Sequence, residues 1–208
     1  MFFSFDGVDG AGKTTQITSF VEWLRASGQT VVLCRDPGST PLGEAVRRIL
    51  LEPNGPRIDR RSEMLLYMAS RAQLVDEIIR PALAAGQTVV CDRYLLANLV
   101  YQGHAGGLDI ESIRRVGQVA IDGLEPDLTF VLDLAPEEAA KRLTRPRDRM
   151  ESQGAAFDLA VREGFRREAQ RDPRRFVRVD ASQPVDVVQA EIRSVASRLL
   201  VQPSENPR

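Results

Sequence analysis

The sequence of 208 residues predicts an α/β fold, a doubly wound five-stranded parallel sheet flanked by helices. Short apolar runs of strand length alternate with segments whose apolar residues recur at helical spacing. A glycine-rich loop joins the first run to the first helix. Charged residues stand at the ends of several runs, where the following loops begin at Asp6, Arg35, Asp92 and Asp133. In a parallel sheet these ends meet at one edge, where ligands gather.

The first half of the chain predicts three strands. An aromatic-rich run at 2–6 and two further runs, at 30–34 and 87–91, have the length and apolar character of buried strands. Helices are expected at 13–26, 42–51 and 61–85. Pro81 marks a kink or restart in the last of these, because proline lacks the N–H of a helical hydrogen bond.

The second half continues the alternation. Strands are expected at 128–132 and 176–179. Helices are expected near 95–102 and 109–122, from Pro136 as a first helical residue, at 157–171 and at 184–200. Residues 103–107 form a glycine-rich loop, and residues 201–208 read as a frayed tail. With 43% hydrophobic residues, the chain is expected to form a single domain, 1–208.

Composition narrows the classes of function. A net charge of −1 gives no pull toward nucleic acid or membrane, so neither is expected as a partner. Cys34 and Cys91 lie inside apolar runs without metal-ligand spacing, which predicts buried thiols and a cytoplasmic location. A single histidine, His104, argues against triads and multi-histidine metal sites. The first apolar run meets Asp6 too early for a signal peptide.

A phosphate-binding loop (P-loop) stands between the first strand and the first helix. Residues 7–14 read G-V-D-G-A-G-K-T, the pattern G-x-x-x-x-G-K-T. The glycines let backbone N–H groups approach phosphate oxygens, Lys13 reaches the outer phosphates, and the Thr14 hydroxyl suits Mg²⁺. Only two of the 28 basic residues are lysines, and the forked arginine side chain cannot replace Lys13 there. The loop therefore predicts nucleotide binding.

Beyond the loop, ordered blocks of residues run through nearly the whole chain. They are F-D-G-V-D-G-A-G-K-T-T-Q from Phe5, R-D-P-G-S-T-P-L-G-E from Arg35, S-R-A-Q from Ser70, D-R-Y from Asp92, Y-Q-G from Tyr101, D-R-M-E from Asp148 and D-A-S-Q-P from Asp180. In these blocks the chain resembles the bacterial thymidylate kinases, a family of P-loop nucleoside monophosphate kinases. This resemblance implies transfer of the ATP γ-phosphoryl group to dTMP, giving dTDP, with Mg²⁺ and a homodimer.

The resemblance also assigns the phosphate and metal contacts. The implied ATP-binding residues are Gly7, Val8, Asp9, Gly10, Ala11, Gly12, Lys13, Thr14 and Thr15. Arg93 is implied as the catalytic partner of the acceptor phosphate, for which its forked guanidinium is suited. Thr14 and Asp92 are implied to hold Mg²⁺, and the alternative for Asp92 is a catalytic role in orienting the acceptor phosphate. Asp133 also ends an apolar strand and is a rival to Asp92, which family precedent favours.

Two predicted helices supply the implied nucleoside site. Tyr67 and Arg71 are four residues apart and share a helix face. By resemblance Tyr67 stacks on thymine and Arg71 bonds the base edge, although a core position for Tyr67 stays open. Asn98 is implied to read the base, and Tyr101 to crowd the sugar 2′ position. Asp9 is implied to reach the acceptor's 3′-hydroxyl.

The family resemblance places a further catalytic cation in a lid segment. One branch of the family carries an arginine inside the P-loop, where this chain has Gly10. The cation is therefore expected from the lid, residues 142–154, whose arginines are Arg142, Arg145, Arg147 and Arg149. Arg149 and Arg145 are the first candidates to stabilise the transferred phosphoryl group. A solvated basic loop is the alternative.

Some positions depart from the family pattern, and rival functions stay open. Ser70 replaces an aspartate and Ala97 a serine near the base site, so the strictness of thymine selection stays open. A kinase of another nucleoside monophosphate or of a deoxynucleoside is the nearest rival. Arg93 favours an acceptor that already carries a phosphate. A non-catalytic nucleotide switch is a rival of another class, but the chain has no N-K-x-D motif.

Overall fold

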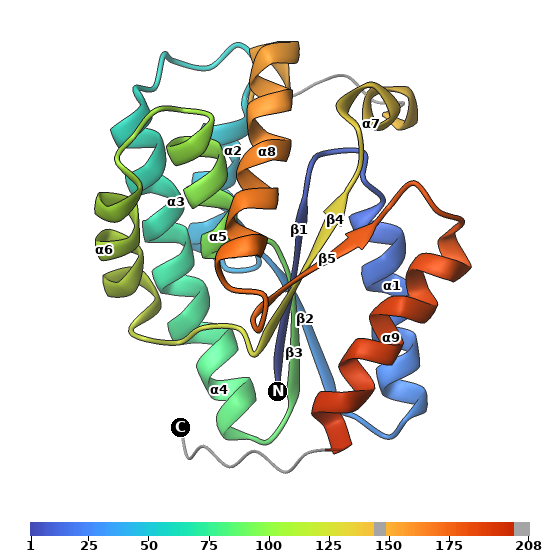
Figure 1. The fold of residues 1–208 in the computed structure, drawn as a ribbon. Helices are drawn as coiled ribbons and strands as arrows, with labels where there is room; N and C mark the ends of the chain where they lie inside the picture. The colour runs from blue at the N-terminus through green and yellow to red at the C-terminus, as the bar shows by residue number, and fades with distance from the viewer. Residues whose placement is uncertain (144–148, 202–208) are drawn as a thin grey trace.

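Five parallel strands form the centre of the protein, in a computed structural model that describes residues 1–143 and 149–201 (Figure 1). The strands are β1 Phe2–Gly7, β2 Val31–Arg35, β3 Thr88–Asp92, β4 Leu128–Asp133 and β5 Phe176–Asp180. Their order in the sheet is β2-β3-β1-β4-β5. The predicted fold class is confirmed. Since the connections from β1 and β3 run to opposite sides, the ends of these two strands form the crevice where α/β folds bind ligands.

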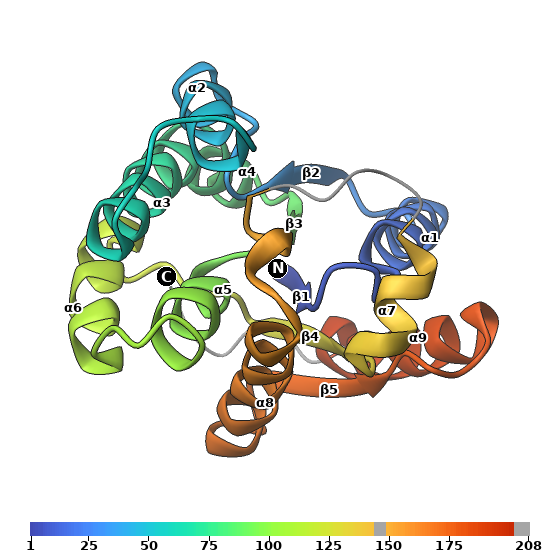
Figure 2. The same ribbon diagram turned by 90° about the horizontal axis from the view of Figure 1, so that it is seen from above.

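Helices cover both faces of this sheet (Figure 2). One face carries α1 Lys13–Ala26 and α9 Val185–Val201. The other carries α3 Arg60–Leu74, α5 Leu95–Asn98, α6 Ile110–Ile121 and α8 Ala155–Arg171. Helix α2, Pro41–Leu51, packs beside α3, and α7, Pro136–Arg142, stands near the loop that follows β1. β1 is buried along its whole length, because its neighbours and both helical layers enclose it.

Strand periodicity divides the core into two halves. Phe3 and Phe5 point to one face and pack against Phe20 of α1, with ring centroids 5.3 and 5.4 Å away. Phe2 points to the other face, where its ring meets Tyr94 edge-on at 5.1 Å. The aromatic-rich first run is therefore a buried strand, as predicted.

The long helix predicted at 61–85 is interrupted, and the α-helix restarts at Arg80 with Pro81 in its first turn, as predicted. A π-helical turn, η1 Val75–Ile79, separates α3 from the short α4, Arg80–Ala84. Pro81 removes one helical N–H, and its ring crowds the carbonyl of Glu77, four residues earlier. The helix therefore widens before the proline rather than at it.

Other local differences concern helix ends and the lid. A second π-helical turn, η2 Leu99–His104, carries the helix into the predicted glycine-rich loop. In the segment predicted as a lid, the described residues include a short 3₁₀ turn, η3 Glu151–Gln153. Cys34 and Cys91 are buried free thiols, paired in register on β2 and β3. Within the described residues, no helix is long and apolar enough to cross a membrane.

Candidate active site

The P-loop follows β1 directly and leads into α1. Gly12 precedes the helix with φ +89°, and no side chain caps the first turn of α1. Free N–H groups at a helix start attract anions. Gly7 and Gly10 also have positive φ, and a Cβ on them would lie 2.4 Å from the Leu132 carbonyl oxygen and 2.3 Å from that of Ala139. Only glycine fits these two positions without displacing the backbone.

The Lys13 side chain folds back over this loop. Its Nζ donates to the carbonyl oxygens of Gly7 and Val8, each at 3.0 Å, and lies 3.5 Å from Asp9. Burial, followed by repulsion from Arg93, lowers the pKa of Lys13. A buried cation held by carbonyl oxygens is placed to bind a polyanion.

A cleft of about 850 Å³ opens beside the loop. The P-loop lines it from Asp9 to Thr15, and residues 181–185 line it from the connection between β5 and α9. Thr14 and Thr15 lie exposed in its wall, and Arg142 lines it from the end of α7. This cleft has the size and the backbone donors that a nucleoside triphosphate requires.

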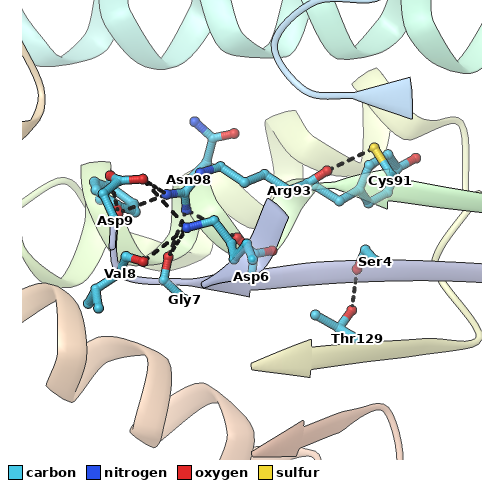
Figure 3. Close-up of polar contacts among 12 residues, drawn as sticks. Ser4, Asp6, Gly7, Val8, Asp9, Cys91, Arg93, Asn98 and Thr129 are labelled. Atoms are coloured by element: carbon cyan, nitrogen blue, oxygen red, sulfur yellow. Dashed lines mark hydrogen bonds and ion pairs between the residues drawn. The ribbon is translucent and has the colours of Figure 1, made fainter. Parts of the chain in front are cut away.

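Arg93 stands at the end of β3 in a left-handed conformation, with φ +71°. Such a conformation costs a non-glycine residue about 1–3 kcal/mol, so its neighbours must hold it. The Cys91 thiol donates to the Arg93 carbonyl at 2.9 Å, and the guanidinium binds Asp9 at 2.6 Å and the Gly7 carbonyl at 3.1 Å (Figure 3). The guanidinium is thus fixed where the two central strands end.

Asp9 and Tyr101 complete this cluster. The Tyr101 hydroxyl donates to Asp9 at 3.2 Å, and its ring lies under the Arg93 guanidinium, 5.1 Å from the ring centroid. Burial opposes ionisation of Asp9, but the charges of Arg93 and Lys13 outweigh it and lower the pKa of Asp9. Burial raises the pKa of Tyr101 well above its ordinary value, so its hydroxyl keeps its proton. Asp9 is therefore an anion between two cations.

Three further carboxylates end strands near or beside this cluster, and they differ in their partners. Asp92 lines the cleft, and its Oδ1 is buried without a hydrogen-bond partner among the described residues. Asp6 is fully buried, and burial raises its pKa from 3.8 to about 7. Asp133 instead binds Arg162 at 2.7 Å and Arg166 at 2.9 Å, both on α8. Of the two rivals for the metal, Asp92 therefore faces the cleft and Asp133 is held by arginines.

A second, smaller pocket of about 100 Å³ adjoins the cleft. Its walls include all the residues implied for the nucleoside: Asp9, Tyr67, Arg71, Arg93, Asn98 and Tyr101. Asp9, Asp36, Arg47 and Arg93 line both cavities. The two departures from the family pattern lie in different places. Ala97 lines the pocket, whereas Ser70 is buried on α3 outside it.

Arg71 is already held by an acid. Its Nε lies 2.5 Å from Asp36, and both side chains are almost fully buried. Asp36 and Arg47 are site residues that the sequence analysis did not assign. The R-D-P-G block contained Asp36, but nothing in the sequence showed that its partner stands 35 residues away on α3.

The described lid arginines lie apart from each other. Arg142 donates to the Ala181 carbonyl at 3.1 Å and lines the large cleft. Arg149 donates to the Leu50 carbonyl at 2.8 Å and binds Glu63 at 2.7 Å. Arg145 and Arg147, expected as lid cations, lie outside the described residues.

A large phosphate cleft that opens onto a small second pocket, at the switch point of a parallel sheet, defines a P-loop nucleoside monophosphate kinase. A family model described as thymidylate kinase matches residues 5–192, and the chain belongs to the thymidylate kinase family. The predicted family and enzyme class are confirmed.

Relatives match over almost the full length. The chain is 44% identical to the thymidylate kinase of Symbiobacterium thermophilum, over 96% of this chain and 94% of that protein. It is 44% identical to the thymidylate kinase of Deinococcus radiodurans, over 95% of this chain and 96% of that protein. The crystal structure of thymidylate kinase from Ehrlichia chaffeensis superposes with a TM-score of 0.76 at 33% identity, covering 95% of this chain and 98% of that chain.

Proposed function

We propose that this site transfers the γ-phosphoryl group of ATP to the 5′-phosphate of dTMP, giving dTDP. The observation that carries this proposal is the meeting of two cavities at Arg93 and Asp9. The larger one carries the P-loop and would hold the ATP phosphates, with its nucleoside toward residues 182–185. The smaller one would hold the nucleoside monophosphate. Arg93 lines both, at the place where two phosphates would meet.

On the acceptor side, each role needs a group that the pocket offers. The Arg93 guanidinium would bind two oxygens of the acceptor phosphate, taking them in place of Asp9. Arg71, held rigidly by Asp36, would donate to a base carbonyl. Tyr67, half-buried in the pocket wall, would stack on the base, and Tyr101 would crowd the sugar 2′ position. Asp9, ionised, would accept from the 3′-hydroxyl.

On the donor side, catalysis rests on positioning and charge. Lys13 would leave the carbonyl oxygens of Gly7 and Val8 for the outer phosphates, which also restores a normal environment for its charge. A lid cation would face the transferred group. Arg142 is the described lid arginine that lines the cleft. Arg149 and Arg145 remain candidates, and Arg149 would first have to leave Glu63.

The residues present fit Mg²⁺ bound together with phosphates. Among the described residues no group of three or more acidic, histidine or cysteine side chains could hold a metal. Mg²⁺ needs less, because it keeps waters and shares phosphate oxygens with one or two protein ligands. Thr14 and Asp92 both line the cleft; Thr14 offers a hydroxyl, and Asp92 a buried carboxylate oxygen that has no hydrogen-bond partner within the described residues. Mg²⁺ there would neutralise charge on the phosphates.

We also propose a homodimer and a cytoplasmic location. Adjacent helices α2, α3 and α6 expose apolar side chains: Leu42, Ile49, Leu65 and Val119. Val119 is 82% exposed, and apolar side chains that gather on neighbouring helices, unlike ones scattered singly, mark a surface that a partner covers. Sedimentation velocity would show a dimer, and Val119→Glu should shift it toward monomer. A monomeric wild type would contradict the proposed dimer.

The cytoplasmic location is proposed because the cytoplasm supplies the ATP and nucleotide substrates.

An acceptor panel tests the reaction. ADP release is measured with Mg-ATP and, in turn, dTMP, dUMP, dCMP, AMP and thymidine. We expect fast turnover with dTMP only. Turnover with thymidine but not dTMP would refute the monophosphate kinase, and no turnover with any acceptor would favour a nucleotide switch. Lys13→Ala should abolish turnover while the protein stays folded by circular dichroism.

A further inference from the structure

Glu63 is a buried carboxylate that lies outside both cavities and yet contacts residues of the acceptor pocket. It stands in the first turn of α3, and its side chain is fully buried. A carboxylate in such a place needs charged or hydrogen-bonding partners. Within the described part of the chain it has three: Arg60 Nη1 at 3.1 Å, Gln102 Nε2 at 2.8 Å and Arg149 Nη2 at 2.7 Å.

The carboxylate determines which way the Gln102 amide faces. A carboxylate between two guanidinium groups accepts hydrogen bonds and cannot donate them. Gln102 must therefore turn its NH₂ group toward Glu63. Its carbonyl oxygen then faces the other way, where it accepts from Asn98 Nδ2 at 2.7 Å. Gln102 and Asn98 both line the acceptor pocket.

The same logic fixes the Asn98 amide. Because Asn98 gives its NH₂ group to Gln102, its Oδ1 is left over. This oxygen is buried and has no hydrogen-bond partner among the described residues. Asn98 and Arg93 line the same pocket, and in Figure 3 the Asn98 amide is drawn apart from the contacts of the P-loop. A buried oxygen without a partner favours a ligand that brings an N–H donor.

We propose that Glu63 is a positioning residue that sets the hydrogen-bond polarity of the base pocket through Gln102 and Asn98. Thymine and uracil carry an N–H at ring position 3, whereas cytosine has an unprotonated nitrogen there. An acceptor oxygen on Asn98 bonds the first two and meets a lone pair of the third. Glu63 thereby selects against a cytosine nucleotide without touching the base. This inference rests on the proposed role of Asn98 as a base reader.

The variant Glu63→Gln tests the polarity. A glutamine can donate as well as accept, so Gln102 and then Asn98 are free to turn over. Binding of dTMP and of dCMP is measured by calorimetry without ATP. We expect the ratio of the two dissociation constants to shift toward dCMP by about tenfold, the range of one or two neutral hydrogen bonds. The KM for ATP should stay unchanged, because Glu63 does not line the donor cleft.

An exchanged variant and a control separate polarity from structure. In Glu63→Gln/Gln102→Glu, the carboxylate at residue 102 accepts from both neighbours, so Asn98 keeps its orientation and the wild-type ratio should return. Arg60→Gln removes another partner of Glu63 without altering the relay, so its ratio should match wild type. Should Glu63→Gln fail to fold, an exchanged variant that lacks the wild-type ratio would still overturn the relay.

Four results would be decisive. A folded Glu63→Gln variant with the wild-type ratio, or an exchanged variant without it, overturns the positioning role. If Arg60→Gln changes the ratio of dissociation constants as strongly as Glu63→Gln does, the positioning role is also overturned, because the change in the ratio is then structural. A wild-type protein that does not prefer dTMP to dCMP contradicts the proposed function itself, and is recognised before any variant is made.

Discussion

The buried carboxyl group of Asp6 should make the protein less stable as the pH rises. Asp6 is fully buried at the end of β1, and its Oδ2 has no hydrogen-bond partner within the described part of the chain. Its nearest cation, Arg93, is 3.5 Å from Oδ1 and is bound more closely by Asp9, at 2.6 Å. Burial therefore dominates and raises the pKa of Asp6 from 3.8 to about 7.

The sign and size of the effect follow from proton linkage. Above pH 4 the unfolded chain loses this proton while the folded protein keeps it, so the free energy of unfolding falls until the pH passes about 7. A difference of about three pH units corresponds to about 4 kcal/mol at pH 8. About 2 kcal/mol of this is already lost at pH 5, where the unfolded carboxyl group is largely ionised.

Asp6→Asn removes the titration and keeps the shape of the side chain. We expect the variant to have a higher free energy of unfolding than the wild type. This difference should grow by about 2 kcal/mol between pH 5 and pH 8. Urea unfolding without nucleotide, followed through the single tryptophan, Trp23, measures it. Asp122→Asn, at a side chain that is 84% exposed, is the control and should run parallel to wild type. Parallel curves for Asp6→Asn would show that Arg93 and Lys13 keep Asp6 ionised, and would refute the reasoning.

Three further substitutions probe the site. Gly10→Ala should lower stability by about 1–3 kcal/mol and reduce kcat, because its Cβ would lie 2.3 Å from the Ala139 oxygen; unchanged thermal unfolding would contradict this. Tyr101→Phe removes a hydroxyl bonded to Asp9 and should change the preference for dTMP over its ribonucleotide by about 2- to 10-fold in kcat/KM; an unchanged preference counts against the sugar role. Arg71→Met leaves a buried carboxylate unpaired and should cost about 3–5 kcal/mol in denaturant unfolding, largely recovered by adding Asp36→Asn; additive losses would mean that the two groups are not coupled.

The sequence revealed most of the fold and the donor half of the site because both depend on local patterns. Apolar runs and helical periodicity locate the strands and helices. The P-loop is contiguous, so spacing alone identifies it. The strand-end positions of Asp92 and Arg93 are also a local pattern, because a parallel sheet brings such ends to one edge, but their roles were implied by the family resemblance.

The sequence did not reveal the contacts between distant segments. Glu63 meets Gln102 and Arg149 across 39 and 86 residues, and a glutamate in a helical pattern gives no sign of being buried. Asp133 has the same strand-end signal as Asp92, and only the position of α8 shows that arginines hold it. The π-helical turns before Pro81 and at 99–104 likewise depend on how a helix adjusts its hydrogen bonds to tertiary packing.

The position of α7 gives a physical reason for the missing P-loop arginine. A side chain at residue 10 would need a Cβ where the Ala139 carbonyl oxygen of α7 stands, in a backbone conformation with φ +85°. An arginine there and α7 in this place therefore exclude each other. The same helix that forbids the P-loop cation ends at Arg142, which lines the cleft wall. Because packing against α7 excludes an arginine at residue 10, we expect the catalytic cation to come from the segment that α7 leads into.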